Sequence, residues 1–286
     1  MEYHKLNSDS IERMGISFDL FSHTHTEEHA EVALSILKKL DENGYIEPRI
    51  SEEPYDPIAN QFLPDRYVEG TCPHCNYESA RGDQCDDCGK TLDSKELINP
   101  RSKLNPDAKI EFRETEHLFF KLSEFRDVLL DWLSEGKEHW RSSVINFTRN
   151  WLKEGLIDRA VTRDLDWGIE IPREGYENKR MYVWFEAVMG YYSASVHWAK
   201  NQGKPEEWKK WWENEDSEHY YFMAKDNIPF HTIIWPAMLS GCGYKLPYDV
   251  PANEYLLLDS SQFSKSRRHA IWIPDYLDRY DPELLR

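Results

Sequence analysis

The sequence predicts a mixed α/β protein in which a parallel sheet is accompanied by a small metal-binding module. After residue 180, short apolar runs alternate with stretches of helical periodicity, the pattern of a parallel sheet whose strands are joined by helices. Between residues 45 and 110 the chain is instead rich in Pro, Asp and Asn and carries two Cys-x-x-Cys pairs. Such a segment is typical of a module held by a metal rather than by a broad core.

The first elements are a polar N-terminal segment and a helix. In residues 1–25, Phe18, Leu20 and Phe21 are the expected buried anchors. Thr24 and Glu27 then have the spacing of a capping box, and a helix is expected to run from there to Gly44, which stands where a helix ends. One face of this helix is apolar. Its members are Ala33, Ile36, Leu37 and Leu40.

The two Cys-x-x-Cys pairs are the most specific feature of the 45–110 module. Cys72 and Cys75 are followed, after a loop long enough to fold back, by Cys85 and Cys88. Two such pairs place four sulfurs around one tetrahedral Zn²⁺, and four sulfurs leave no open position, so a structural zinc is expected. Two disulfides or plain buried thiols are the alternatives.

Past residue 111 the periodicity becomes helical again. Ser123 is the expected cap of one helix, which ends near Gly136, and a second helix ends before Gly155. Both look like ordinary packing elements. The residues at their inward positions are Phe125, Leu129, Trp132 and Leu133 in the first helix, and Val144, Phe147, Trp151 and Leu152 in the second.

The last third of the chain carries the predicted parallel strands. Strands are expected at 181–185, 220–223 and 255–258, with helices from the first strand to about residue 200 and over about 229–240. The acidic, Trp-rich stretch 206–218 is expected to lie at the surface. Ligands of such sheets bind beyond the carboxyl ends of the strands.

Polar and aromatic side chains gather at those strand ends. Aromatics can line an apolar pocket, a carboxylate can hold an ammonium or a ribose, and a Ser/Lys/Arg loop can hold phosphates. Taken singly, each is as well explained by core packing, capping or a polar surface. The candidates are Trp184, Glu186 and Tyr191; Lys225, Asp226, Asn227, Phe230, His231 and Trp235; and the loop 260–268. His23, His25 and His29 are better explained as polar residues at a helix start than as a second metal site.

Composition narrows the class of function. The chain has 286 residues and 14% aromatic residues, enough for a large core and too many for a disordered chain. It contains no apolar run of about 18 residues and no basic-then-apolar N-terminus, so neither a membrane span nor a secretory signal is expected. A formal charge of −17 argues against indiscriminate nucleic-acid binding, although basic residues can still gather on one face. Thiols arranged for metal suit a reducing cytoplasm.

Several motifs resemble those of a known family. The sequence Gln-Phe-Ser-Lys-Ser at 262–266 resembles the KMSKS signature of class I aminoacyl-tRNA synthetases. Four further motifs narrow the resemblance to the methionyl-tRNA synthetases, of an archaeal-like type, over essentially the whole chain. They are FLPDRYVEG at 62–70, TRDLDWG at 162–168, YVWF at 182–185 and KDNIPFH at 225–231.

The resemblance implies a Rossmann-like domain split by a connective-peptide insertion that carries the zinc knuckle at 72–88. The end of the first Rossmann half would occupy 1–44, the insertion 45–180, the second half 181–255, and the signature loop with the start of a stem-contact fold 256–286. The family's N-terminal His-x-Gly-His part and its anticodon-binding domain have no match here, so we expect a fragment of the enzyme.

The resemblance also implies roles for individual residues. Asp226 would lie near the substrate ammonium and adenosine, with Asn227 beside it at the ATP site. Lys265, flanked by Ser264 and Ser266, would neutralise charge on the transferring phosphates. Methionine, ATP with Mg²⁺, and tRNA(Met) would be the partners, and methionyl-adenylate the intermediate. The methionine pocket would be built by Trp184, Ala187, Tyr191, His231 and Trp235.

Some positions depart from the family pattern. Ala224 replaces a glycine, Gln262 replaces the first lysine of the signature loop, and the usual Asp-Ala-Pro-Ile is Glu-Ala-Val-Met at 186–189. A second knuckle, frequent in archaeal-type relatives, would need cysteines at positions that carry weak ligands here, so we expect one zinc. Those positions are Asp56, Ala59, Ser102 and Asn105.

Two functional hypotheses follow. The chain contributes to methionine activation and transfer to tRNA, although the fragment alone is expected to be inactive. The alternative is a non-catalytic zinc-ribbon module that binds a partner or tRNA.

Overall fold

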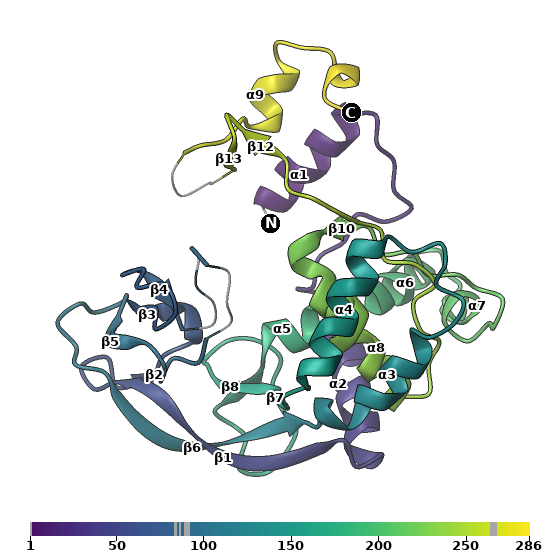
Figure 1. Ribbon diagram of the computed structural model, residues 1–286. Coiled ribbons are helices and arrows are strands. Elements are labelled where there is room, and N and C mark those ends of the chain that lie inside the picture. The colour runs from purple at the N-terminus through teal and green to yellow at the C-terminus, as the bar shows by residue number, and fades with distance from the viewer. Residues whose placement is uncertain (1, 83–84, 86, 89–91, 264–267) are drawn as a thin grey trace. The chain divides into compact units, whose positions relative to one another are not determined.

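The chain divides into two compact units in the computed structural model, which describes residues 2–82, 85, 87–88, 92–263 and 268–286 (Figure 1). Unit 1 comprises Met1–Asn43, Glu124–Leu156 and Ala187–Arg286, and unit 2 comprises Gly44–Ser123 and Ile157–Glu186. Residues 124–156 thus pack with unit 1. None of the helices in the described part of the chain has the length and apolar content needed to cross a bilayer.

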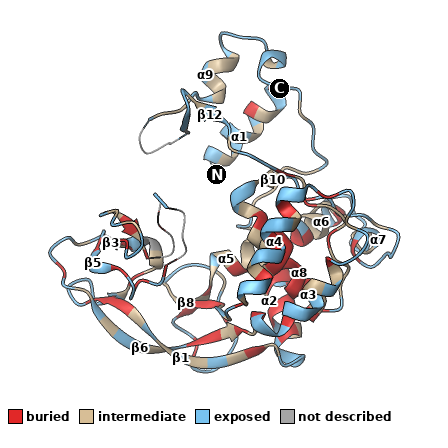
Figure 2. Ribbon diagram, viewed as in Figure 1, coloured by how far each residue is buried: buried red, intermediate tan, exposed pale blue. Residues whose placement is uncertain are grey.

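Unit 1 is mainly helical. Helix α2 packs on α6 and α8, and α3 packs on α4; buried residues concentrate on α2, α4 and α8 (Figure 2). The helices are α1 (Glu2–Arg13), α2 (Glu27–Glu42), α3 (Arg126–Trp132), α4 (Ser142–Glu154), α6 (Gly190–Asn201), α7 (Lys209–Trp212), α8 (Trp235–Gly241) and α9 (Ile273–Leu277). Shorter turns are the 3-10 segments Ala187–Met189, Lys225–Asn227 and Pro282–Leu284 and the π-helix Phe230–Ile234.

The predicted parallel pairing is present in unit 1 but short. Strand β10 (Met223–Ala224) pairs in parallel with β11 (Ala252–Asn253), and Tyr220 forms a parallel bridge with Asp249. The predicted strand at 255–258 is instead an antiparallel hairpin of β12 (Leu257–Leu258) and β13 (Ser261–Gln262). Asp259 and Ser260 both have positive φ in its two-residue turn, which matches the twist of antiparallel strands.

Unit 2 is built from antiparallel sheets. The first has the order β2-β1-β6-β7, the second β4-β3-β5, and the third pairs β8 with β9. Helix α5 (Val183–Glu186) ends the unit, and Leu122–Phe125 forms a 3-10 turn after β6. The strands are β1 (Ile46–Asp56), β2 (Gln61–Phe62), β3 (Val68–Thr71), β4 (Ala80–Arg81), β5 (Ile98–Ser102), β6 (Glu111–Phe120), β7 (Arg159–Ala160), β8 (Thr162–Asp164) and β9 (Lys179–Met181). A 3-10 turn, Asp65–Tyr67, precedes β3.

The helix expected after residue 24 is confirmed, but its cap is not. Thr26, in extended backbone, accepts a hydrogen bond from the His29 N–H at 3.1 Å and is the N-cap, whereas Thr24 lies outside the helix. The four predicted apolar residues are buried. His29 is also fully buried, where its Nδ1 lies 2.9 Å from the hydroxyl of Ser193, so it is not a polar surface residue. Phe18, a predicted anchor, is 57% exposed.

Two segments predicted from local periodicity adopt a different structure. Residues 111–120 form β6, not helix, because ten consecutive positions pair antiparallel with β1. Of residues 181–185, only Met181 belongs to a strand, and that strand pairs antiparallel with β8, while 183–186 is helical. A short apolar run fits either structure, so a distant strand decides the outcome.

Two smaller expectations are also wrong. Ser123 does not cap α3; its N–H and hydroxyl donate to Oδ1 of Asp158 at 3.0 and 2.7 Å. The segment 206–218 is not wholly at the surface, because Trp212 is buried against the rings of Tyr192 and Trp235.

Candidate functional site

The four predicted cysteines converge on one point of unit 2. Cys72, Cys75, Cys85 and Cys88 carry sulfur atoms that all lie within 4.8 Å of one another. The Sγ atoms are 3.9 Å apart between Cys72 and Cys88, and 3.6 Å apart between Cys75 and Cys85. A tetrahedral ZnS₄ centre with Zn–S bonds of about 2.3 Å has edges of about 3.8 Å. A disulfide would bring two sulfurs to about 2.05 Å, and all four cysteines are free.

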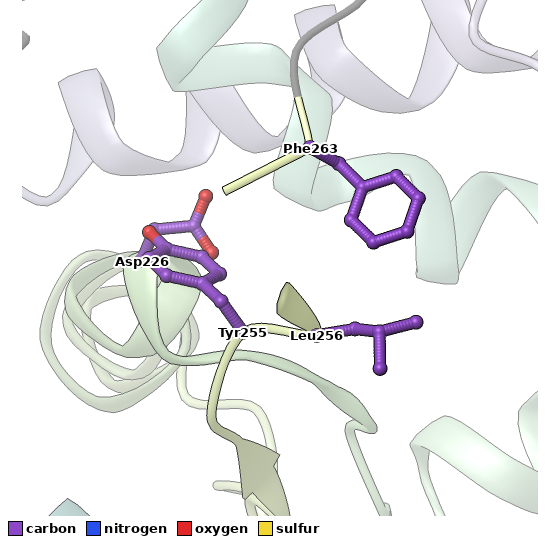
Figure 3. Close-up of a pocket in the computed structure, with 4 residues that line it drawn as sticks. All are labelled: Asp226, Tyr255, Leu256 and Phe263. Atoms are coloured by element: carbon purple, nitrogen blue, oxygen red, sulfur yellow. The ribbon is translucent and has the colours of Figure 1, made fainter. Parts of the chain in front are cut away.

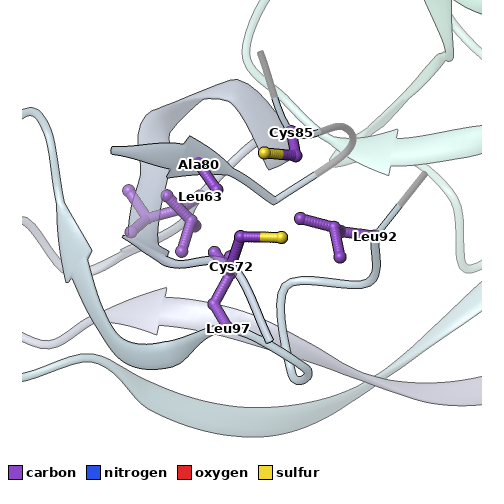
Figure 4. Close-up of a cluster of buried hydrophobic side chains, with 7 residues drawn as sticks. Leu63, Cys72, Ala80, Cys85, Leu92 and Leu97 are labelled. Carbon is purple, nitrogen blue, oxygen red and sulfur yellow. The ribbon is translucent and has the colours of Figure 1, made fainter. Parts of the chain in front are cut away.

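The backbone supports the same centre. Burial opposes ionisation of the Cys72 thiol, but the N–H groups of His74 and Cys75 and the thiols of Cys75 and Cys85 outweigh it and lower the pKa of Cys72 to about 7, whereas the pKa values of Cys75 and Cys85 are raised. Cys72 and Cys85 sit in a small apolar cluster (Figure 4). The other buried members of the cluster are Leu63, Val68, Ala80, Leu92 and Leu97. The residues therefore fit a closed thiolate metal site.

The positions of the absent second knuckle are joined by hydrogen bonds. The carboxylate of Asp56, fully buried, accepts from the N–H groups of Ile58 and Ala59 at 2.9 and 3.0 Å and from the Ser102 hydroxyl at 3.1 Å. The Asn105 N–H in turn donates to Ser102 Oγ at 3.2 Å. Within the described residues, the four-cysteine group is the one set of His, Cys, Asp and Glu side chains suited to a metal ion.

In unit 1, three of the predicted pocket residues, Tyr191, His231 and Trp235, form a cluster with Tyr221, and we call these four residues the aromatic site. The carbonyl of Asn227 lies 2.9 Å from Nδ1 of His231, so Nδ1 carries the proton and Nε2 accepts a hydrogen bond from the Tyr191 hydroxyl at 2.8 Å. Burial lowers the pKa of His231. His231 lies in the π-helical turn, a feature frequent at functional sites.

Tyr221 was not identified from the sequence. Its hydroxyl accepts a hydrogen bond from the indole N–H of Trp235 at 3.0 Å, and its ring packs edge-on against Tyr191 at 4.8 Å between centroids. Burial raises the pKa of Tyr221, so its hydroxyl stays protonated. The available signal was the apolar run 220–223 itself, because a buried tyrosine needs a polar partner for its hydroxyl.

The remaining predicted methionine-pocket residues belong to different units. Ala187 begins the 3-10 turn that leads into α6 of unit 1. Trp184 lies on α5 and belongs to unit 2.

A cavity of about 440 Å³ lies beside Asp226. It is lined by Asp226, Tyr255, Leu256 and Phe263 (Figure 3). The side-chain amide of Asn227 lies 3.3 Å from Oδ1 of Asp226. A cavity with one carboxylate and two aromatic rings suits a ligand with a flat ring and a hydroxyl or ammonium group.

The cationic loop after β13 lies outside the described residues. Ser264, Lys265 and Ser266 therefore have no described position, and their roles stay predictions. The described hairpin β12–β13 leads directly into this loop, and Phe263 at its end lines the cavity.

Solved structures of a methionyl-tRNA synthetase have a similar fold. Mycobacterium tuberculosis methionyl-tRNA synthetase bound by methionyl-adenylate matches with a TM-score of 0.63 at 20% identity, over 93% of this chain and 46% of that chain. A second structure of that protein in complex with methionyl-adenylate matches with a TM-score of 0.64 at 21% identity, over 92% and 45%. The chain shares the fold of these structures. A family model of class I tRNA synthetases also matches it, which gives the class of protein, a class I aminoacyl-tRNA synthetase.

The family follows from the sequence comparison. The model described as tRNA synthetases class I (M) matches residues 1–286, and the chain belongs to that family. Relatives named methionine–tRNA ligase are 57% identical over 285 residues in Dehalococcoides mccartyi (99% of this chain, 51% of the relative) and 54% identical over 286 residues in Thermomicrobium roseum (99% and 49%). The chain spans about half the length of these curated relatives.

Proposed function

We propose that the chain forms part of a methionine–tRNA ligase, which activates methionine with ATP and transfers it to tRNA(Met) in the cytoplasm. The observation that carries the proposal is the hydrogen bond between His231 Nδ1 and the Asn227 carbonyl. It ties the aromatic site to the turn that presents Asp226 to the 440 Å³ cavity. An amino acid held at the first site would therefore meet a nucleotide held at the second.

The aromatic site is the proposed methionine side-chain pocket. A thioether is soft and polarisable, and it makes favourable contacts with ring edges. Tyr191 keeps acceptor capacity after donating to His231, and the buried rings of Tyr221 and Trp235 form an apolar wall. Ala187, in the same unit, is proposed to complete the pocket, and a contact of Trp184 with methionine stays a prediction from the family resemblance.

The cavity beside Asp226 is the proposed nucleotide site. Asp226 would hold the substrate ammonium or the ribose, with Asn227 beside it, and Tyr255 and Phe263 would offer faces to the adenine ring. Lys265, between Ser264 and Ser266, would neutralise the phosphates. Mg²⁺ would accompany ATP and help to neutralise its phosphate charge.

In the proposed reaction the methionine carboxylate attacks the α-phosphate, the bond to pyrophosphate breaks, and methionyl-adenylate forms. A ribose hydroxyl at the tRNA 3′ end then attacks the methionyl carbonyl, and AMP leaves. No protein nucleophile is needed, so the residues of this chain act by positioning and by electrostatic stabilisation.

The four cysteines would hold one Zn²⁺ with a structural role, because four thiolates leave no position for a substrate. Unit 2 with this knuckle would correspond to most of the insertion at 45–180. Residues 1–44 and 181–255 would belong to the nucleotide-binding fold, and 256–286 to the signature loop and stem-contact region.

The test is methionine-dependent exchange of labelled pyrophosphate into ATP, measured on the complete gene product and on residues 1–286 alone. We expect exchange in the complete product, a loss of at least about tenfold in its His231→Ala variant, and no exchange by residues 1–286. Exchange that is absent from the complete product, with tRNA binding retained, would instead favour a non-catalytic tRNA-binding module.

A further inference from the structure

Three of the sequence motifs meet at one carboxylate in unit 2. Asp65, from the motif 62–70, has its Oδ2 atom 3.2 Å from the Tyr182 hydroxyl and 3.4 Å from Nη2 of Arg163. The Arg163 guanidinium also lies over the Tyr182 ring, 3.9 Å from its centroid. Burial alone would lower the pKa of Arg163, but Asp65, Tyr182 and Glu53 outweigh it and raise that pKa. The motifs at 62–70, 162–168 and 182–185 therefore form one polar cluster, and their proposed roles so far do not explain it.

The backbone of Asp65 contacts Gly82, which precedes the second cysteine pair in sequence. Its carbonyl accepts a hydrogen bond from the Gly82 N–H at 3.1 Å, and the same N–H also reaches the Val68 carbonyl at 3.1 Å. Gly82 lies three residues before Cys85 on the loop that carries the second cysteine pair. A Cβ at position 82 would lie 2.8 Å from the Asp65 oxygen and 2.2 Å from Ser94 Oγ, so this close approach requires glycine.

Tyr182, another member of the cluster, holds the first turn of helix α5 by hydrogen bonds. The N–H of Tyr182 donates to the Val161 carbonyl at 2.9 Å. The Tyr182 carbonyl accepts from the N–H groups of Phe185 and Glu186 at 2.9 and 3.2 Å, which makes it the first hydrogen-bonded turn of α5. Trp184 lies in that turn. A four-residue helix has few hydrogen bonds of its own, so its stability depends on what holds Tyr182.

We propose that Asp65 is a positioning residue that couples the cysteine centre to Trp184. Metal on the four thiolates holds the loop with Gly82 in place, Gly82 holds the Asp65 backbone, and the Asp65 side chain fixes Tyr182 and the first turn of α5. The relevance to methionine rests on the proposed function of Trp184, whereas the coupling itself does not. It gives the zinc centre a mechanical role in forming the first turn of α5.

Hydrogen exchange of the Phe185 and Glu186 amides, followed by mass spectrometry on the whole chain loaded with Zn²⁺, measures this coupling. In Asp65→Asn we expect these amides to exchange roughly fivefold faster, the factor for a hydrogen bond of about 1 kcal/mol. Removing zinc with a chelator should accelerate them in the wild-type chain but add nothing further in Asp65→Asn. Asp107→Asn, which changes an exposed carboxylate of the same unit, should match wild type.

Gly82→Ala disrupts the contact between Gly82 and the Asp65 carbonyl. It therefore tests the coupling without chelation, which could unfold unit 2. This variant should keep its zinc, by metal analysis, and still show faster exchange at Phe185 and Glu186. Unchanged exchange in Asp65→Asn or in Gly82→Ala, or equal acceleration by chelation in Asp65→Asn and wild type, would overturn the proposal. Protection of the same amides by added methionine is scored separately, and its absence would count against the proposed role of Trp184 and not against the coupling.

Discussion

The hydroxyl of Tyr191 donates a hydrogen bond to Nε2 of His231 at 2.8 Å. The direction of this hydrogen bond is determined by the contact that Nδ1 makes on the opposite side of the imidazole ring. There the Asn227 carbonyl occupies Nδ1 at 2.9 Å, which fixes the tautomer. The imidazole is therefore a neutral bridge between a tyrosine that is 41% exposed and the turn that carries Asp226. A charged His231 would lose the acceptor that orients Tyr191.

This bridge predicts a spectroscopic effect of Tyr191→Phe. In ¹⁵N-histidine NMR spectra at pH 8, His231 should show a protonated Nδ1 and an unprotonated Nε2, and its titration should be displaced toward lower pH, because burial lowers its pKa from 6.5. Tyr191→Phe should shift the Nε2 signal and weaken methionine binding roughly tenfold, the effect of about 1.4 kcal/mol. Tyr220→Phe, which removes an exposed hydroxyl bonded to Glu218, is the control. An Nε2 signal identical in wild type and Tyr191→Phe would show that the bridge does not form.

The cysteine geometry predicts one zinc per chain. Metal analysis after dialysis should find about one equivalent of zinc, and Cys75→Ser should lose most of it because three thiolates hold the ion less tightly than four. Cys242→Ser changes a buried thiol far from the centre in sequence and should keep the metal. Asp56→Ala should also leave the zinc content unchanged, since its partners are N–H groups and a hydroxyl. Two equivalents in wild type, falling to one in Asp56→Ala, would contradict the prediction.

His117 predicts a loss of stability in acid. Its ring is buried, Nδ1 lies 3.0 Å from Thr162 Oγ1, and burial, followed by Lys179 and Arg163, lowers the pKa of His117 to about 3. Between pH 6.5 and 3 the unfolded chain binds a proton at this position that the folded chain does not, so the free energy of unfolding falls as pH falls. One such group contributes a slope of about 1.4 kcal/mol per pH unit.

Urea unfolding at pH 7 and pH 5 measures that slope. His117→Asn keeps an acceptor near the Nδ1 position but cannot take up the proton, so the variant should show a flatter pH dependence than wild type. His25→Asn, at an exposed position, should retain the wild-type slope. Parallel curves for wild type and His117→Asn would mean that the ring is not held neutral.

The buried face of α2 predicts a large packing effect. Leu40 is fully buried where α2 packs on α6 and α8. Leu40→Ala should lower the free energy of unfolding by about 2–5 kcal/mol, because it leaves a cavity in a packed interface. Glu31→Ala, on the exposed face of the same helix, should change it by less than about 0.5 kcal/mol. Similar urea midpoints for the two variants would contradict the assignment of the face.

The sequence predicted correctly those features that depend on short-range spacing. It was less informative where pairing with a distant segment decides the secondary structure. The apolar face of α2 repeats within one helix, and the Cys-x-x-Cys pairs contain their own turn geometry, so both were predicted. The outcome at 111–120 depended on β1, more than fifty residues away in sequence, and the outcome at 181–185 depended on β8. Tyr221 could not be assigned a role because its partner Trp235 becomes its neighbour only after folding.

By itself the sequence determined the mixed α/β class, the four cysteines suited to a metal ion and the aromatic residues from which a thioether pocket can be built, because residue type and short-range spacing carry that information. Only the tertiary structure decided which strands pair, that His231 is a neutral bridge, and that Asp65 links the cysteine loop to Tyr182. These three features depend on hydrogen bonds between residues far apart in sequence. Such hydrogen bonds stabilise the fold only when burial excludes water as a competing partner.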